Sequence, residues 1–555
     1  MMLPTNLYGA LLSCTIYLHA VFAVMPTCDN EIYCKGNLLK TVQMSRIFPD
    51  SKTFVDMEMT RSPSDVMKNF NSLMSSTNNH PSRSQIKSFV QDNFQPGNEL
   101  EDWKLPDFDP NPPFLRRIKV PEYRKFAKDL VQLWANFSRI LKPDVFKEPE
   151  RYSIIPVSNG FVIPGGRFRE FYYWDSYWII KGLLASGMHQ TVRGMIDNFL
   201  SMVDRYGFVP NGGRIYYLNR SQPPLLNLMV HEYLKATNDI PWLKKNVHLL
   251  QEELKYWLKT QTITFTYNNA KHTLAQYAVD DPSPRPESYS EDVKTCSVRK
   301  SDEDIKNCYK DLKSGAETGW DYSSRWFIDN RGSYGKNLSE IQTRMIIPVD
   351  LNSFLAQAFK LVSTFSYIAG DSDSHQYWLN LHLSWKQSIQ DVLFNETAGI
   401  WFDMDRKRLR HRTGFYPSNL APLWSELYEE TSLGDLAVQY LQKEGIFEYP
   451  AGVPTSLLNT GEQWDLPNAW PPLQSIVIMA LKRSGSPKAL GAARVLAKKW
   501  IDNNLLIYKR TCFMYEKYNA ESVGVVGGGG EYSIQTGFGW TNGEIFELIE
   551  EFYSK

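Results

Sequence analysis

An apolar pattern at helical spacing runs from about residue 120 to the C-terminus, and it constrains the fold more than any other feature of the sequence. In residues 175–207 the apolar side chains recur every three or four positions on two successive stripes, and Gly207 stands where the second helix is expected to end. Residues 350–394 and 471–505 repeat this layout. The pattern has no fixed repeat length, which argues against a solenoid of short repeats. We therefore predict an all-α protein built from helical hairpins.

Strand patterns are scarce and limited to hairpin-sized pieces such as residues 399–415, whose basic run 406–412 we interpret as a solvated hairpin tip. Residues 24–115 are richer in Ser, Asn, Asp and Pro and less periodic, so we expect them to form an N-terminal extension that wraps the helical body. The body, residues 116–555, is predicted to be one large domain.

The N-terminus and the cysteines indicate secretion. Residues 1–23 contain no acidic or basic side chain and have an apolar middle, which predicts a signal peptide removed near Ala23; an uncleaved anchor is the alternative. No later apolar run is long enough to span a membrane. We therefore expect a secreted, extracellular protein that is free of the membrane after cleavage. The spacing of the remaining cysteines favours the pairs Cys28–Cys34 and Cys296–Cys308 and leaves Cys512 free.

Four Asn-x-Ser/Thr sequons bear on the same question. Asn136, Asn337 and Asn395 are expected to carry glycans on a secreted chain. Asn219 is expected to be bare, because it immediately precedes an arginine that we place in a ligand pocket.

The charge balance excludes several classes of partner. Lys+Arg and Asp+Glu both number 61, so a uniform surface for nucleic acid or anionic membrane is not expected. No cysteine or histidine spacing matches a zinc site, and we predict neither a metal nor a cofactor.

Six loop stretches share an unusual mixture of arginines, carboxylates and aromatic rings beside Gly or Pro, and we call them the ring-and-charge loops. A sugar is bound by this mixture, because a ring opposes its C–H face while planar charged groups bind adjacent hydroxyls. Arg167, Arg220 and Arg285 are the candidate hydroxyl clamps, and structural ion pairs are their alternative role. The stretches are PGGRFREFYYWDSY (164–177), FVPNGGRIYYLNRSQPP (208–224), DPSPRPESYSED (281–292), GAETGWDYSSRW (315–326), NTGEQWDLPNAWPP (459–472) and YEKYNAESVGVVGGGGEYSIQTGFGWTN (515–542).

Other chemistries fit less well. The chain has no G-x-S-x-G elbow of a serine hydrolase, and no G-K-[ST] follows the glycines at 527–530, so they do not form a phosphate-binding loop. We interpret the glycine run as a flap that closes over a ligand, since Glu531 and Tyr532 follow it directly.

These motifs resemble those of the α,α-trehalase family, glycoside hydrolase family 37. PGGRFREFYYWDSY and QWDLPNAWPP look like its two signatures and GGGGEY like its glycine-rich segment, and the match covers roughly residues 120–545. The start of the chain is similar to soluble secreted insect-type trehalases. The resemblance implies an (α/α)6 toroid that hydrolyses the small molecule trehalose to two glucose molecules with inversion. We expect the protein to be a monomer.

The resemblance also assigns roles to residues. It implies that Asp321 is the general acid and Glu516 the general base. Asp321 then needs a raised pKa, for which Trp320 and Tyr322 would supply apolar cover and Glu317 or Asp175 a negative charge. The implied sugar contacts are Arg167, Phe168, Tyr173, Trp174, Asp175, Asn211, Arg220, Gln222, Arg285, Glu287, Gly319, Trp464 and Glu531.

Three rival interpretations remain at this point. An (α/α)6 glucoamylase-like enzyme would act on longer glucans, a sugar sensor would bind without catalysis, and a helical scaffold would do neither. Retention of both Asp321 and Glu516 argues against the sensor, and the ring-and-charge loops argue against the scaffold.

Overall fold

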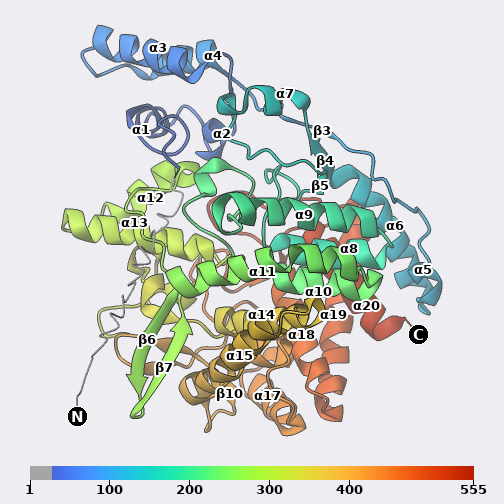
Figure 1. The fold of residues 1–555 in the computed structure, drawn as a ribbon. Coiled ribbons are helices and arrows are strands. Elements are labelled where there is room, and N and C mark those ends of the chain that lie inside the picture. The colour runs from blue at the N-terminus through green and yellow to red at the C-terminus, as the bar shows by residue number, and fades with distance from the viewer. Residues whose placement is uncertain (1–27, 555) are drawn as a thin grey trace, which may run out of the picture.

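A computed structural model describes residues 28–554 of the chain (Figure 1). The predicted signal peptide, residues 1–23, lies outside the described residues. Within residues 28–554, no helix is long and apolar enough to cross a bilayer.

The centre of the described chain is a closed ring of six helices, in which each helix packs against the next and the last packs against the first. These inner helices are buried on nearly every side; α18, for example, buries all of residues 471–481. Such helices are apolar all round, because neighbours surround them completely. The inner helices are α8 (Asp175–Ala185), α10 (Leu226–Thr237), α14 (Val349–Ala369), α16 (Ala421–Trp424), α18 (Pro471–Arg483) and α20 (Gly539–Tyr553).

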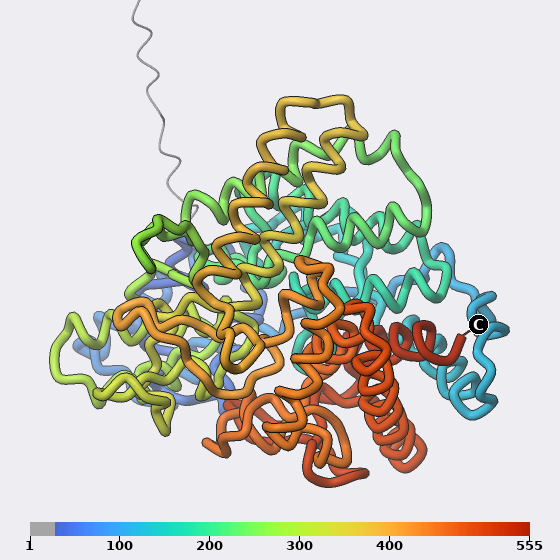
Figure 2. The backbone as a smooth tube through the Cα atoms, turned by 90° about the horizontal axis from the view of Figure 1, so that it is seen from below, coloured from blue at the N-terminus to red at the C-terminus, as the bar shows by residue number. Residues whose placement is uncertain are grey.

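A second layer of helices covers the ring, and one outer helix precedes each inner helix along the chain. Outer helices are amphipathic: α9 buries Val192, Ile196, Phe199 and Val203 on one stripe. Figure 2 shows the α14–α15 hairpin, in gold, beside the green segment that contains α11. This alternation confirms the all-α fold and the (α/α)6 toroid. The outer helices are α6 (Pro121–Phe137), α9 (His189–Tyr206), α11 (Ile240–Thr260), α15 (Ser372–Leu393), α17 (Thr431–Lys443) and α19 (Pro487–Thr511).

The remaining α-helices lie outside the two layers. Helices α1 to α4 form a group at one edge of the toroid (Figure 1). They have a hydrophobic cluster of their own, which also takes in Tyr172, Tyr216 and Tyr217 from the loops of the toroid. The chain before residue 100 is therefore packed directly against two of the ring-and-charge loops. These remaining α-helices are α1 (Asn37–Met44), α2 (Lys52–Val55), α3 (Pro63–Ser76), α4 (Arg83–Asn93), α5 (Phe114–Arg117), α7 (Pro143–Lys147), α12 (Tyr289–Cys296) and α13 (Asp302–Glu317).

All named strands pair in an antiparallel sense, in small separate sheets. The predicted hairpin at 399–415 is confirmed, with Asp403 opposite Arg412. The hairpin β6–β7 was not predicted, although its turn residues Asn268 and Asn269 adopt the left-handed conformation that such turns need. The strands are β1 (Glu58–Met59), β2 (Phe94–Gln95), β3 (Leu100–Asp102), β4 (Ser138–Leu141), β5 (Phe161–Val162), β6 (Thr262–Tyr267), β7 (Ala270–Ala275), β8 (Ile346–Ile347), β9 (Phe394–Asn395), β10 (Ile400–Trp401), β11 (Asp403–Asp405), β12 (Arg410–Arg412), β13 (Asn468–Ala469) and β14 (Tyr518–Asn519).

Both predicted disulfides are confirmed, and Cys512 is free and exposed. Cys296–Cys308 joins α12 to α13, the two helices that flank the 297–301 turn. Helix α13 leads directly into residues 318–321, so this crosslink fixes the start of one of the ring-and-charge loops.

Candidate active site

The ring-and-charge loops gather at one end of the toroid because most of them lead into the N-terminus of an inner helix. Residues 164–174 precede α8, residues 208–225 precede α10, residues 459–470 precede α18 and residues 512–538 precede α20. These loops and the segment 285–321 together enclose one cavity. Its lining is Lys52, Arg167, Phe168, Tyr172, Trp174, Asp175, Asn211, Tyr217, Arg220, Gln222, Arg285, Glu287, Ser288, Ala316, Gly319, Asp321, Trp464, Trp470, Glu516, Glu531, Tyr532, Phe538 and Trp540.

Every residue predicted for the site lines this cavity except Tyr173. Tyr173 is fully buried behind the wall, where its hydroxyl donates to the Glu253 carboxylate and accepts from the Leu226 N–H at 3.0 Å. It therefore holds the first signature against α10 and α11 and does not face the cavity. Residues 171–174 are all aromatic, so the sequence gave no indication of which of these rings faces the cavity.

Several lining residues were not predicted. Four of them lie inside the ring-and-charge loops, and the composition of those loops was the only signal that could have pointed to them. These four are Tyr172, Tyr217, Trp470 and Tyr532. Lys52 comes from α2, in the weakly periodic N-terminal segment, and no local pattern pointed to it.

Stacked tryptophans form one wall of the cavity. Trp464 and Trp470 stack with ring centroids 3.8 Å apart and an interplanar angle of 3°. Trp320 stacks on the other side of Trp464 at 5.6 Å and 18°. Trp174 and Trp540 meet Trp464 and Trp470 at larger angles. The wall is a rigid apolar platform of the kind that packs against a sugar face.

Asp321 lies on the turn that follows α13. Gly319 has φ +78°, and a Cβ there would lie 2.7 Å from the Trp174 ring, so the turn needs glycine. Burial raises the pKa of Asp321 to about 7, with the Glu531 charge adding to the rise and Arg285 opposing it. Trp320 and Tyr322 are buried as expected, but the negative charge comes from Glu531 and not from Glu317 or Asp175.

Asp175 is the first residue of α8 and lies in the same cavity. Burial holds its pKa well above the usual range, and the charges of Glu516 and Asp321 add to this. Because the Asp175 carboxyl group stays protonated, it carries no charge that could raise the pKa of Asp321. The negative charge that does so is that of Glu531.

Glu516 is almost completely buried and is held by its surroundings. Its Oε1 accepts from the Tyr532 hydroxyl at 2.8 Å, and its backbone oxygen accepts from Trp540 Nε1 at 3.1 Å. Oε2 has no hydrogen-bond partner within the described chain and lies 4.0 Å from Lys517 Nζ. Burial raises the pKa of Glu516, while Lys517, the Tyr532 hydrogen bond and Arg167 favour the ionised form.

The three candidate arginines line the cavity and also form ion pairs. Arg220 Nη2 lies 2.6 Å from Glu287 Oε1, and its Nε and Nη1 are buried without a partner among residues 28–554. Arg285 pairs with Asp292 at 2.6 Å and with Glu531 at 3.0 Å. Their two predicted roles are therefore compatible, because a carboxylate on one side of a guanidinium leaves its other N–H groups free for a ligand.

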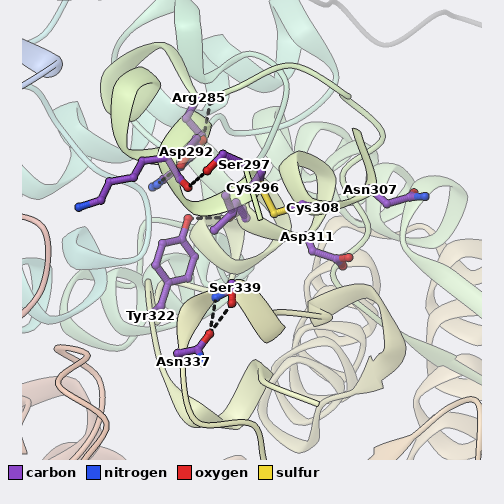
Figure 3. Close-up of a disulfide and its surroundings, with 12 residues drawn as sticks. Arg285, Asp292, Cys296, Ser297, Asn307, Cys308, Asp311, Tyr322, Asn337 and Ser339 are labelled. Atoms are coloured by element: carbon purple, nitrogen blue, oxygen red, sulfur yellow. Dashed lines mark hydrogen bonds and ion pairs between the residues drawn. A yellow bond between two sulfur atoms is a disulfide. The ribbon is translucent and has the colours of Figure 1, made fainter. Parts of the chain in front are cut away.

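The crosslinked helices brace this side of the cavity. Figure 3 shows the Cys296–Cys308 disulfide close to the Arg285–Asp292 pair. Asp292 lies on α12. Tyr322, which follows α13, donates a hydrogen bond from its hydroxyl to the Leu312 backbone oxygen at 2.9 Å. The disulfide thus connects the helix that orients Arg285 with the helix that leads to Asp321.

Asp50, from the N-terminal segment, holds the third arginine. Arg167 Nη2 lies 2.8 Å from Asp50 Oδ1, and its guanidinium lies 4.6 Å from the Tyr532 ring centroid. Because the pair is partly exposed, we expect Asp50→Asn to raise KM for the substrate about two- to fivefold with little change in kcat. Steady-state kinetics test this, with Asp102→Asn, which breaks the exposed pair with Arg139, as the control. An unchanged KM would mean that the ring contacts alone hold Arg167.

Asn219, the sequon predicted to be bare, is partly enclosed by the chain. Its Nδ2 donates to Asp281 Oδ2 at 2.7 Å, and the side chain is half-buried. Asn136 and Asn337 are exposed, whereas Asn395 is half-buried with its Nδ2 3.2 Å from His411 Nδ1. We expect glycopeptide mapping of active, secreted material to find Asn219 unmodified, with Asn136 and Asn337 in the same digest as positive controls. Full occupancy at Asn219 would contradict this placement.

The toroid and the cavity together define a class of protein. An (α/α)6 toroid whose loops surround a cavity with stacked rings, arginines and several carboxyl groups, Asp321 and Glu516 among them, fits the class of glycoside hydrolases. The sequence model of the trehalase family matches residues 46–553, so the chain belongs to that family.

Relatives in several organisms agree with this assignment. The chain is 51% identical over 532 residues to a trehalase of Tenebrio molitor, covering 95% of this chain and 96% of the relative. It is 47% identical to a trehalase of Pimpla hypochondriaca, covering 95% and 90%, and 44% identical to one of Homo sapiens, covering 96% and 91%. The solved structure of the neutral trehalase Nth1 from Saccharomyces cerevisiae shares the fold, with a TM-score of 0.57 and 21% identity over 71% of this chain and 74% of that one.

Proposed function

We propose that this protein hydrolyses α,α-trehalose to two glucose molecules with inversion, with Asp321 as general acid and Glu516 as general base. The supporting observation is that these two carboxyl groups, from distant segments, face one cavity walled by arginines and stacked tryptophans. Family membership supports the substrate.

The environments of the two groups suit opposite roles. Asp321, with a pKa of about 7, is substantially protonated near neutral pH and can protonate the glycosidic oxygen. Burial raises the pKa of Glu516, and Lys517, the Tyr532 hydroxyl and Arg167 oppose that rise. In the ionised form, Oε2, which has no hydrogen-bond partner in the described chain, can accept a proton from water. That water oxygen bonds to the anomeric carbon as the carbon–oxygen bond to the leaving glucose breaks. The attacked glucose is released as the β anomer and the leaving glucose as the α anomer.

Sugar recognition follows from the remaining lining. The buried N–H groups of Arg220 that lack a partner in the described chain can donate to hydroxyls, and the tryptophan wall can pack against a C–H face. The glycine-rich segment lies over the 459–470 loop, where Gly528 O accepts from Asn468 Nδ2 at 2.8 Å. It delivers Glu531 and Tyr532 to the cavity, which favours a substrate enclosed at both ends.

Proton NMR of the purified protein with trehalose tests the reaction. Equal amounts of α- and β-glucose in the first minutes would support inversion, whereas α-glucose alone would mean retention and new roles for both carboxyl groups. Comparison with maltose and maltotriose separates this function from that of a glucoamylase-like enzyme, which would cleave both. A folded sample that releases no glucose would support the sugar-sensor interpretation.

We further propose that the mature chain is secreted and acts as a monomer without a metal or cofactor. The two disulfides support an oxidising compartment. Mass spectrometry of the N-terminus of exported protein tests cleavage near Ala23, and light scattering tests the monomer.

A further inference from the structure

A buried lysine, Lys517, follows the candidate base, and the reaction as described so far uses it only as one of three groups that favour the ionised form of Glu516. Its side chain is fully buried, and Nζ donates to Gln463 Oε1 at 2.7 Å. Nζ lies 4.0 Å from Glu516 Oε2, and 4.9 Å from the ring centroid of Trp470. A lone ammonium is costly to bury, so this one is held by a carboxylate, an amide oxygen and an aromatic face.

Gln463 extends this contact to the candidate acid. Its Nε2 donates to the backbone oxygen of Asp321 at 2.6 Å, while its Oε1 accepts from Lys517. Its own backbone oxygen accepts from Trp470 Nε1 at 2.8 Å and from Asn468 Nδ2 at 3.0 Å. One amide group therefore connects the chain at Asp321 with the residue next to Glu516.

The tryptophan wall makes a second connection between the same two segments. Lys517 caps the stack at Trp470, and the stack continues through Trp464 to Trp320, the residue before Asp321. Arg325 caps the far end, 4.6 Å from the Trp320 ring centroid. Both ends of this cation-capped stack thus adjoin a candidate catalytic carboxyl group in the chain.

We propose that Lys517 is a positioning residue, whose charge favours the ionised form of Glu516 and which, through Gln463, fixes the Asp321 turn relative to the base. This inference rests on the proposed function. Its two parts are separable, because the charge acts on Glu516 directly whereas the hydrogen bonds of Gln463 act on the backbone at Asp321.

The direction of the charge effect follows from the neighbours of the ammonium. The titratable groups that face Lys517 are Glu516, Asp321 and the Tyr532 phenol, whose ring centroid is 5.5 Å from Nζ. Lys517 lowers the pKa of Glu516, and burial lowers the pKa of Lys517 itself. Without the ammonium, the pKa of Glu516 rises, so the base becomes protonated at a higher pH and the acid limb of the pH–rate profile moves upward.

Lys517→Met is the direct test. We expect the acid limb of kcat/KM on trehalose to move up by about one pH unit, with much of the lost activity returning above that limb. The alkaline limb, which we assign to Asp321, should move less. A purely structural defect would lower kcat/KM at every pH without moving either limb. Lys499→Met is the matched control, since Lys499 is also partly buried and donates to the backbone oxygens of Phe447 and Tyr449, away from the cavity.

Two more variants keep the proposal falsifiable if Lys517→Met does not fold. Lys517→Arg keeps the charge, so its acid limb should stay at the wild-type position; a shift would contradict the proposal. Gln463→Leu keeps the ammonium but removes both amide contacts, and we expect kcat to fall about tenfold with the acid limb in place. A folded Lys517→Met protein with both limbs unchanged would overturn the proposed effect of the charge on Glu516. A Gln463→Leu protein with unchanged kcat would overturn the proposed positioning of the Asp321 turn. Wild-type protein that does not hydrolyse trehalose would instead refute the proposed function.

Discussion

Asp321→Asn is expected to lower kcat on trehalose by about 10²–10⁴-fold while KM changes only a few-fold. The amide has nearly the same shape as the protonated carboxyl group, but it has no proton of suitable acidity to give to the glycosidic oxygen. Steady-state kinetics near neutral pH measure the loss. Asp329→Asn, in a turn outside the cavity lining, is the matched control and should keep wild-type turnover.

A substrate with a better leaving group separates loss of the acid from general damage. Fluoride needs little protonation to leave, so α-glucosyl fluoride should be hydrolysed by Asp321→Asn far better than trehalose is, relative to wild type. Equal losses on the two substrates would contradict the role of Asp321 as acid, and near-normal turnover of trehalose would do so more directly.

The same substitution is expected to stabilise the fold at pH 8. Because the pKa of Asp321 is raised to about 7 in the folded state, the folded protein binds more protons than the unfolded chain between about pH 4 and pH 7. Stability therefore falls as pH rises through that window, and above it the folded state holds a buried, ionised carboxylate. Asn removes this penalty, so the thermal midpoint at pH 8 should be higher than that of wild type. Differential scanning calorimetry at pH 4 and pH 8 tests this.

The sequence was sufficient to predict the fold because both helix layers have clear apolar patterns. The amphipathic stripe of α9 and the continuous apolar run of α18 both show helical spacing, and Gly207 ends its helix with φ +80° as expected. The disulfides were predictable because each joins cysteines close in sequence, 6 and 12 residues apart. Closure of the ring, by contrast, depends on the contact between α8 and α20, which no local pattern specifies.

The cavity was predictable where a loop carries rings and charges together, and not where the contact is made across long distances in sequence. Tyr173 was misplaced because neighbouring aromatic residues at a turn point to different sides. Asp50 and Lys52 could not be placed, since their partners Arg167 and Glu170 lie more than 100 residues away. The source of the charge that raises the pKa of Asp321 was also assigned incorrectly, because Glu531 follows the glycine-rich segment and is far from Asp321 in sequence.

Glu516→Gln is the second substitution with a very large expected effect. We expect kcat to fall by about 10²–10⁴-fold on both trehalose and α-glucosyl fluoride, because an improved leaving group does not replace the base that activates water. The amide oxygen can still accept the hydrogen bond from the Tyr532 hydroxyl, so the geometry at Oε1 is kept. Glu444→Gln, a half-buried glutamate that follows α17 and lies outside the cavity lining, is the matched control and should leave both activities near wild type.

An added nucleophile that needs no deprotonation distinguishes loss of the base from loss of the site. Azide can attack the anomeric carbon directly, from the face that the water would use, so Glu516→Gln with α-glucosyl fluoride and azide should yield β-glucosyl azide. Proton NMR of the anomeric signal identifies the product. β-Glucosyl azide would place position 516 on the face opposite the leaving group, as inversion requires. The α product would place the attack on the leaving-group face, and the assignment of Glu516 as the base of an inverting reaction would then be wrong.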